Sequence, residues 1–93
     1  MRTIDRTRRF KKDYKREVRG QYRATLDADL LAAVSLLAID SPLPARLRDH
    51  ALAGDWKDHR DCHIRPDLVL IYRVPDPETL ELVRLGSHSE LGL

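Results

Sequence analysis

The stretch Asp49–Asp67, with the sequence DHALAGDWKDHRDCHIRPD, leads directly into the apolar run Leu68–Tyr72 and decides how the rest of the chain is interpreted. It contains three of the four histidines, the only tryptophan, the only cysteine and five aspartates. Its segment Arg60–Arg65 alternates apolar and ionisable side chains, which predicts a strand with one face of each kind. The apolar positions are Cys62 and Ile64, and the ionisable positions are Asp61, His63 and Arg65. Because the ordinary pKa of histidine lies near neutrality, the ionisable face is a candidate site for proton transfer.

Two tight turns connect this strand to two further strands. Pro66-Asp67 leads into Leu68–Val74, which is nearly continuously apolar, and Pro75–Glu78 leads into Thr79–Leu85. Short turns join antiparallel neighbours, since parallel pairing needs a crossover of a dozen or more residues. The sequence therefore predicts an antiparallel meander, with Met1–Ile4 as a candidate edge strand.

Two helices are predicted before this meander. Thr7 is a candidate N-cap for the first helix, and Gly20 supplies its end. A second helix between Tyr22 and Ile39 has apolar residues at helical period over a wide face, and Ser41–Pro44 ends it. We expect an α+β fold of two layers, in which an N-terminal helical hairpin packs on one face of a small antiparallel sheet and the other face is left bare.

Length and composition restrict the class of protein. With 93 residues and 42% hydrophobic content, residues 1–93 are expected to form a single domain. One cysteine cannot form an intramolecular disulfide, and the N-terminus lacks the apolar run of a signal peptide. No segment approaches the roughly 20 apolar residues that cross a bilayer. We therefore expect a cytoplasmic protein without a membrane partner.

The charge is distributed unevenly along the chain. Residues 1–23 contain ten Arg or Lys and three acidic residues, whereas the remainder has an excess of acidic residues. A basic end of this kind indicates a polyanionic partner such as nucleic acid. The alternative is an ordinary solvated helix face.

A wider set of residues at specific spacings carries a family resemblance. The set is Asp49-His50, Leu52, Gly54, Trp56, Arg60-Asp61, His63, Asp67 and Leu70–Tyr72, followed by Gly86-Ser87-His88. It resembles the YafQ-type toxins of the RelE/ParE superfamily, which belong to bacterial type II toxin–antitoxin systems. The similarity extends over nearly the whole chain, including the helical hairpin. One departure is Gly92, where family members commonly have an aromatic residue that is available for stacking on RNA.

The resemblance implies an mRNA interferase, a small endoribonuclease that cuts mRNA in the ribosomal A site without a metal or cofactor. It implies that a cognate antitoxin, expected to be of the ribbon-helix-helix type, holds the toxin inactive. The family's catalytic positions fall on His50, His63, Asp67 and His88. Candidate substrate contacts are Trp56, Lys57, Arg60, Asp61 and Arg84. Candidate contacts of the basic helix with the ribosome are Arg8, Arg9, Lys11, Lys12, Lys15, Arg16 and Arg19.

The residue types also fit this chemistry independently of the resemblance. Cleavage of RNA by its own 2′-hydroxyl needs a base near that hydroxyl, an acid near the leaving 5′-oxygen and positive charge around the phosphorus. We expect His88 to be the acid and either His63 or His50 to be the base, oriented by Asp67 or Asp61. No CxxC or HExxH spacing is present, so no metal site is expected. Cys62 is expected to pack in the core.

Two other functions use a similar set of elements. A ParE-like gyrase poison would share the helical hairpin and the sheet but needs no acid–base cluster. A non-catalytic nucleic-acid-binding module would use the basic helix and leave the histidines without a role.

Overall fold

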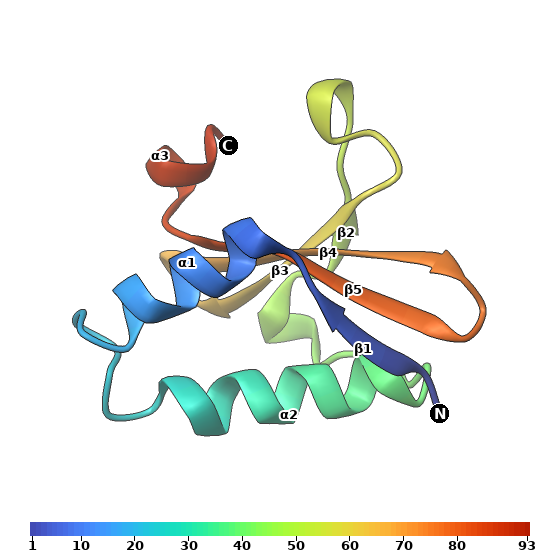
Figure 1. The fold of residues 1–93 in the computed structure, drawn as a ribbon, viewed down its shortest axis with the longest axis horizontal. Coiled ribbons are helices and arrows are strands. Elements are labelled where there is room, and N and C mark those ends of the chain that lie inside the picture. The colour runs from blue at the N-terminus through green and yellow to red at the C-terminus, as the bar shows by residue number, and fades with distance from the viewer.

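The computed structural model describes residues 1–93, and Figure 1 shows α1 and α2 beside a sheet with α3 at its other side. The five strands are arranged in the order β1-β5-β4-β3-β2. The strands are β1 (Thr3–Arg6), β2 (His50–Ala51), β3 (Arg60–Arg65), β4 (Leu68–Asp76) and β5 (Thr79–Gly86). The α-helices are α1 (Arg8–Glu17), α2 (Leu26–Ala38) and α3 (His88–Leu91), and there are two 3₁₀ turns, Ala45–Leu47 and Gly54–Trp56.

Both N-terminal helices form where the sequence predicts them. Thr7 caps α1, because its hydroxyl accepts a 3.0 Å hydrogen bond from the backbone N–H of Phe10. The wide apolar face of α2 packs against the sheet and supplies the residues Leu26, Leu30, Ala33, Val34 and Leu37 to the main core. The α+β class and the helical hairpin are therefore confirmed.

The sheet contains the predicted meander and one further strand at each edge, β1 and β2. β3, β4 and β5 pair antiparallel through short turns, and β2 pairs antiparallel with β3. The N-terminal edge strand β1 is parallel to β5, with Thr3 opposite Thr79. The expectation of a purely antiparallel sheet is therefore wrong. Most of the chain separates β1 from β5, so no short turn dictates the relative direction of these two strands.

Both faces of the sheet are apolar, although to different extents. The larger cluster lies on the side of α2 and includes Tyr72 as well as Cys62, whose core position the sequence predicts. On the other side, Val69 and Ile71 pack with Leu91 of α3, and Leu52, Trp56 and Val83 contact this small cluster. The prediction of a bare second face is wrong, because a strand as continuously apolar as β4 has side chains to bury on both sides.

An irregularity in β3 alters one predicted orientation. The pairing between β3 and β4 shifts between His63 and Arg65. As a result, Arg65 does not join Asp61 and His63 on their face but bonds the carboxylate of Asp29 in α2, at 2.8 Å. A bulge changes which face the following residue occupies, and alternation alone does not reveal it.

Side chains of α1 complete the outer edge of β5 where β1 ends. The hydroxyl of Thr7 donates to the carbonyl of Val83 at 2.7 Å. The carboxylate of Asp13 accepts the N–H of Leu85 at 3.0 Å, and the guanidinium of Arg16 donates to the carbonyl of Leu85 at 2.9 Å. The backbone groups of this edge are therefore satisfied without a neighbouring strand. This edge continues directly into Gly86 and α3.

Candidate active site

Three histidines that are distant in the sequence meet on the face of the sheet opposite α2. His50 comes from β2, His63 from β3 and His88 from the start of α3. The ring centroids of His50 and His63 are 6.4 Å apart, and those of His63 and His88 are 5.0 Å apart. The side chains of His50 and His88 remain 53% and 39% exposed. The cluster can therefore be reached by a substrate.

A buried aspartate lies under His50. Nδ1 of His50 is 3.0 Å from Oδ1 of Asp61 and 2.8 Å from the carbonyl oxygen of Arg48. Its single N–H is aligned with the carbonyl, which leaves Oδ1 of Asp61 buried without a hydrogen bond. Because a carbonyl only accepts, Nδ1 carries the proton and Nε2 is the nitrogen of His50 that exchanges protons. Burial raises the pKa of Asp61, although the neighbouring imidazoles act to lower it.

A second aspartate orients His88. Oδ1 of Asp67 accepts hydrogen bonds from Nδ1 of His88 at 3.0 Å and from the backbone N–H of His88 at 3.3 Å. The side-chain hydrogen bond from His88 lowers the pKa of Asp67, so this carboxyl is ionised at neutral pH. Because a carboxylate only accepts, Nδ1 of His88 carries a proton, which again leaves Nε2 for proton exchange.

His63 lies between the other two imidazoles and differs from them in burial. Burial lowers its pKa, while the carboxylate of Asp61 acts in the opposite direction. The positive charges of His88, Arg48 and His50 lower the pKa further when they are present. His63 is therefore in its neutral form at neutral pH, which is the form that accepts a proton.

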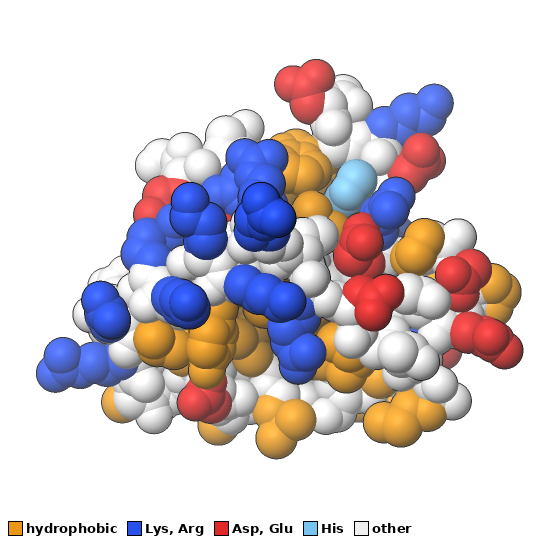
Figure 2. Space-filling view, viewed as in Figure 1, with side chains coloured by type: hydrophobic (Ala, Val, Ile, Leu, Met, Phe, Trp, Pro, Cys, Tyr) orange, Lys and Arg blue, Asp and Glu red, His pale blue; other side chains and the backbone are white.

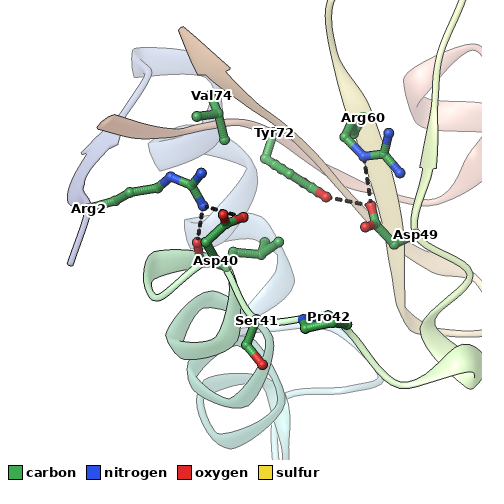
Figure 3. Close-up of a pocket in the computed structure, with 9 residues that line it drawn as sticks. Arg2, Asp40, Ser41, Pro42, Asp49, Arg60, Tyr72 and Val74 are labelled. Carbon is green, nitrogen blue, oxygen red and sulfur yellow. Dashed lines mark hydrogen bonds and ion pairs between the residues drawn. The ribbon is translucent and has the colours of Figure 1, made fainter. Parts of the chain in front are cut away.

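The residue before His50 is fixed by two side chains from the sheet. Figure 3 shows Tyr72 and Arg60 directed toward the carboxylate of Asp49. Tyr72 donates its phenol hydrogen to Asp49, and Nε of Arg60 lies 3.2 Å from the same oxygen. These contacts, together with the pairing of His50 opposite Asp61, hold β2 in place.

The helix that begins with His88 is only four residues long and is anchored from outside. Ser87 and Glu90 form a capping box. Glu90 also pairs with Arg16 of α1, whose Nε lies 3.2 Å from the carboxylate. A Cβ at Gly86 would lie 2.9 Å from the guanidinium of Arg16, so only glycine allows this approach without a shift. The position of His88 therefore depends on α1.

A cavity of about 480 Å³ opens beside the histidines and is rich in arginine. His63 and His88 line it together with Arg46, Arg48 and Arg65. Arg65 is held by Asp29, whereas Arg46 and Arg48 form no ion pair. Neither Arg46 nor Arg48 is among the site residues predicted from the sequence. The available signal was their position just before His50, in the loop that follows the prolines.

The predicted substrate contacts lie in different surroundings. Trp56 packs on the small apolar cluster and contacts the ring of His59 edge to face. Lys57 is exposed, and Asp61, which is 3% exposed, contacts His50 rather than solvent. The guanidinium of Arg84 is not free to bind a substrate. Its Nε donates to Asp13 at 2.7 Å, and the side chain is only 13% exposed.

The comparisons with known proteins agree with this geometry. Solved structures that share this small α+β fold include toxins of bacterial toxin–antitoxin systems. Residues 2–92 match the family described as "Bacterial toxin of type II toxin-antitoxin system, YafQ". The chain belongs to this YafQ toxin family.

Individual relatives resemble the chain over nearly its full length. The mRNA interferase toxin YafQ of Escherichia coli K12 is 36% identical over 90 residues, which cover 95% of this chain and 97% of that protein. A copper-bound mutant toxin from Helicobacter pylori has a TM-score of 0.89 at 40% identity and covers 98% and 99% of the two chains. The Escherichia coli DinJ-YafQ complex has a TM-score of 0.81 at 36% identity, covering 98% of each chain.

No group of three or more His, Cys, Asp or Glu side chains in this chain is arranged to hold a metal ion. None of its helices combines the length and the apolar character that crossing a membrane requires.

Proposed function

We propose that this toxin is an mRNA interferase, an endoribonuclease that cleaves ribosome-bound mRNA by metal-independent acid–base catalysis. The observation that carries the proposal is the convergence of His50, His63 and His88 on one open face, with centroid separations of 5.0 and 6.4 Å. Kinship supports the activity, because relatives that match nearly the full chain bear the name mRNA interferase toxin.

Two adjacent rings can take the base and acid roles that the reaction needs. His63, whose pKa burial lowers, is the general base that takes the proton of the 2′-hydroxyl. His88, held by the ionised Asp67, is the general acid that protonates the leaving 5′-oxygen. The 2′-oxygen forms a bond to phosphorus as the bond to the 5′-oxygen breaks, which gives a 2′,3′-cyclic phosphate and a 5′-hydroxyl. His50, held by Arg48 and Asp61, adds positive charge beside the phosphate when it is protonated.

The surface of α1 supports binding to the ribosome. Figure 2 shows Lys and Arg side chains gathered over this helix. The exposed basic residues of α1 without an ion pair are Arg8, Arg9, Lys11, Lys12 and Lys15, and exposed Arg19 follows two residues after the helix ends. Contacts of such side chains with phosphates position a protein without reading sequence, so this face is suited to ribosomal RNA. Arg16 differs, because its guanidinium is bound to Asp13, Glu17 and Glu90.

A cognate antitoxin is the second partner that we propose, and a ribbon-helix-helix protein is the type expected. The related Escherichia coli toxin has been solved in complex with DinJ. In this chain an apolar groove of about 600 Å³ lies between α1 and α2, where Leu31 is 68% exposed. Arg6, Lys11 and Lys15 also line it, which favours an amphipathic segment with acidic residues at its margins.

Cleavage of a translated message with histidine variants tests the proposal. His50→Ala, His63→Ala and His88→Ala should each lower the cleavage rate at least about tenfold, with thermal unfolding unchanged. His59→Ala is the matched control, because His59 lies against Trp56 outside the cluster, and it should cleave normally. A message with a single 2′-deoxynucleotide at the cut position should resist cleavage. Wild-type rates in the three cluster variants would refute the acid–base mechanism.

A further inference from the structure

Arg48 adopts a backbone conformation that is costly for arginine. It ends the 3₁₀ turn at Ala45–Leu47 with φ 48° and ψ 45°, in the left-handed region. Side chains with a Cβ are disfavoured there, and Asn, Asp and Gly are the residues that usually occupy it. Glycine would remove the cost at this exposed position, and its backbone would still provide the carbonyl that His50 binds. Local strain of this kind is concentrated at functional sites, so the side chain of Arg48 is expected to have a role.

The position of that side chain indicates the role. Arg48 lines the 480 Å³ cavity together with His63 and His88, the two rings that the proposed mechanism uses as base and acid. No carboxylate pairs with Arg48, because Asp49 binds Tyr72 and Arg60, and Asp61 lies against His50. The guanidinium is therefore free to bind an anion. The backbone carbonyl oxygen of Arg48 meanwhile lies 2.8 Å from Nδ1 of His50 and fixes that ring.

We propose that Arg48 is a catalytic residue, whose guanidinium binds the nonbridging oxygens of the scissile phosphate and neutralises the charge that accumulates there during attack. This inference rests on the proposed RNA cleavage. As the 2′-oxygen bonds to phosphorus and before the 5′-oxygen leaves, negative charge concentrates on two equatorial oxygens. A planar guanidinium contacts two such oxygens at once, whereas an ammonium acts as a point charge. The interaction strengthens in the transition state and therefore acts on kcat.

Three variants at this position separate catalysis from folding. Arg48→Gly and Arg48→Asn both tolerate the left-handed conformation and keep the carbonyl that His50 needs, but they remove the cation. Each should melt at the same or a higher temperature than the wild type. Each should lose about 10²-fold in kcat with KM changed less than about threefold. Arg48→Lys should retain part of the rate, because it keeps the charge without the planar fork.

A matched control and a rescue experiment make the test specific. Asp58, which is exposed and also has a positive φ of 68°, lies in the loop before β3 outside the cavity. Asp58→Gly should cleave at the wild-type rate. Added guanidinium ion at millimolar concentration should restore part of the rate of Arg48→Gly and should not accelerate His63→Ala.

The outcomes distinguish this inference from the proposed function. Arg48→Gly with a wild-type kcat, or with an increased KM alone, would overturn the catalytic assignment. In that case a loss of rate in His63→Ala and His88→Ala would leave the acid–base mechanism intact. If these two histidine variants also cleave normally, the proposed function itself fails.

Discussion

Asp61→Asn is expected to make the protein more stable and less active at the same time. The carboxylate of Asp61 is 3% exposed, and its Oδ1 accepts no hydrogen bond, although His50 lies 3.0 Å away. Burial raises its pKa, which means that the ionised form is less favourable in the folded protein than in the unfolded chain. Asparagine has nearly the same shape and no charge, so the substitution removes this penalty.

The size of the gain follows from the cost of leaving a buried polar group without a partner. That cost is about 1–3 kcal/mol, and part of it remains because the amide also lacks a complete set of partners. We expect a net gain on the order of 1 kcal/mol, which corresponds to an increase of about 4–8 °C in the melting temperature of a domain this size. Activity should fall about tenfold, because the carboxylate no longer stabilises the positive charge that His63 gains as it takes the proton of the 2′-hydroxyl.

The pH dependence of stability provides an independent test that Asp61→Asn stabilises the protein. A raised folded pKa means that the destabilisation by Asp61 is absent below its ordinary value of 3.8 and develops as the pH rises through the raised value. Calorimetric melting should therefore show a gain at neutral pH that disappears in acid. Asp55→Asn is the control, because Asp55 is exposed and should give no gain at either pH. A lower melting temperature for Asp61→Asn at neutral pH would refute the reasoning.

Three other results are expected. Asp13→Ala removes the partner of Arg84 and should lower the free energy of unfolding in urea by about 3–5 kcal/mol; an unchanged midpoint would contradict this role for the ion pair. Arg16→Lys should lower kcat while KM and salt dependence stay constant, because lysine cannot reach both Leu85 and Glu90; wild-type kinetics would refute this positioning role, and a higher KM with unchanged kcat would instead identify an RNA contact. The cleavage rate should increase with pH, and the midpoint of this increase should lie below 6.5, the ordinary pKa of histidine, because burial lowers the pKa of His63. A midpoint above 6.5 would exclude His63 as the base.

The regular elements were predictable because their periodicity is a local property. The caps and apolar faces of α1 and α2 can be identified from residues within a few positions of each other, as Thr7 and Phe10 illustrate. The meander was predictable for the same reason, since short turns leave only antiparallel pairing. The parallel pairing of Thr3 with Thr79 was not, because nothing near either residue specifies a partner so far along the chain.

The sequence indicated which residues form the candidate site, but not which side chains hold them in position. The spacing of His50, His63 and His88 identified the cluster through a resemblance. Their partners depend on contacts across elements: Arg16 reaches Glu90 across Gly86, and a bulge turns Arg65 toward α2. The backbone angle of Arg48 is also invisible in the sequence, because arginine is not a residue from which a left-handed conformation is expected.

The arginines divide into two groups according to their partners, and this division changes what the basic character of the chain means. Arg16, Arg65 and Arg84 each bind a carboxylate and connect elements of the fold. Their charges are largely neutralised where they lie, so they attract RNA much less than the net charge suggests. Arg48 and the unpaired side chains of α1 retain their charge toward solvent. The positive charge available to RNA is therefore concentrated at the exposed face of α1 and beside the histidines, which are the two places where we propose contacts with the ribosome and with the scissile phosphate.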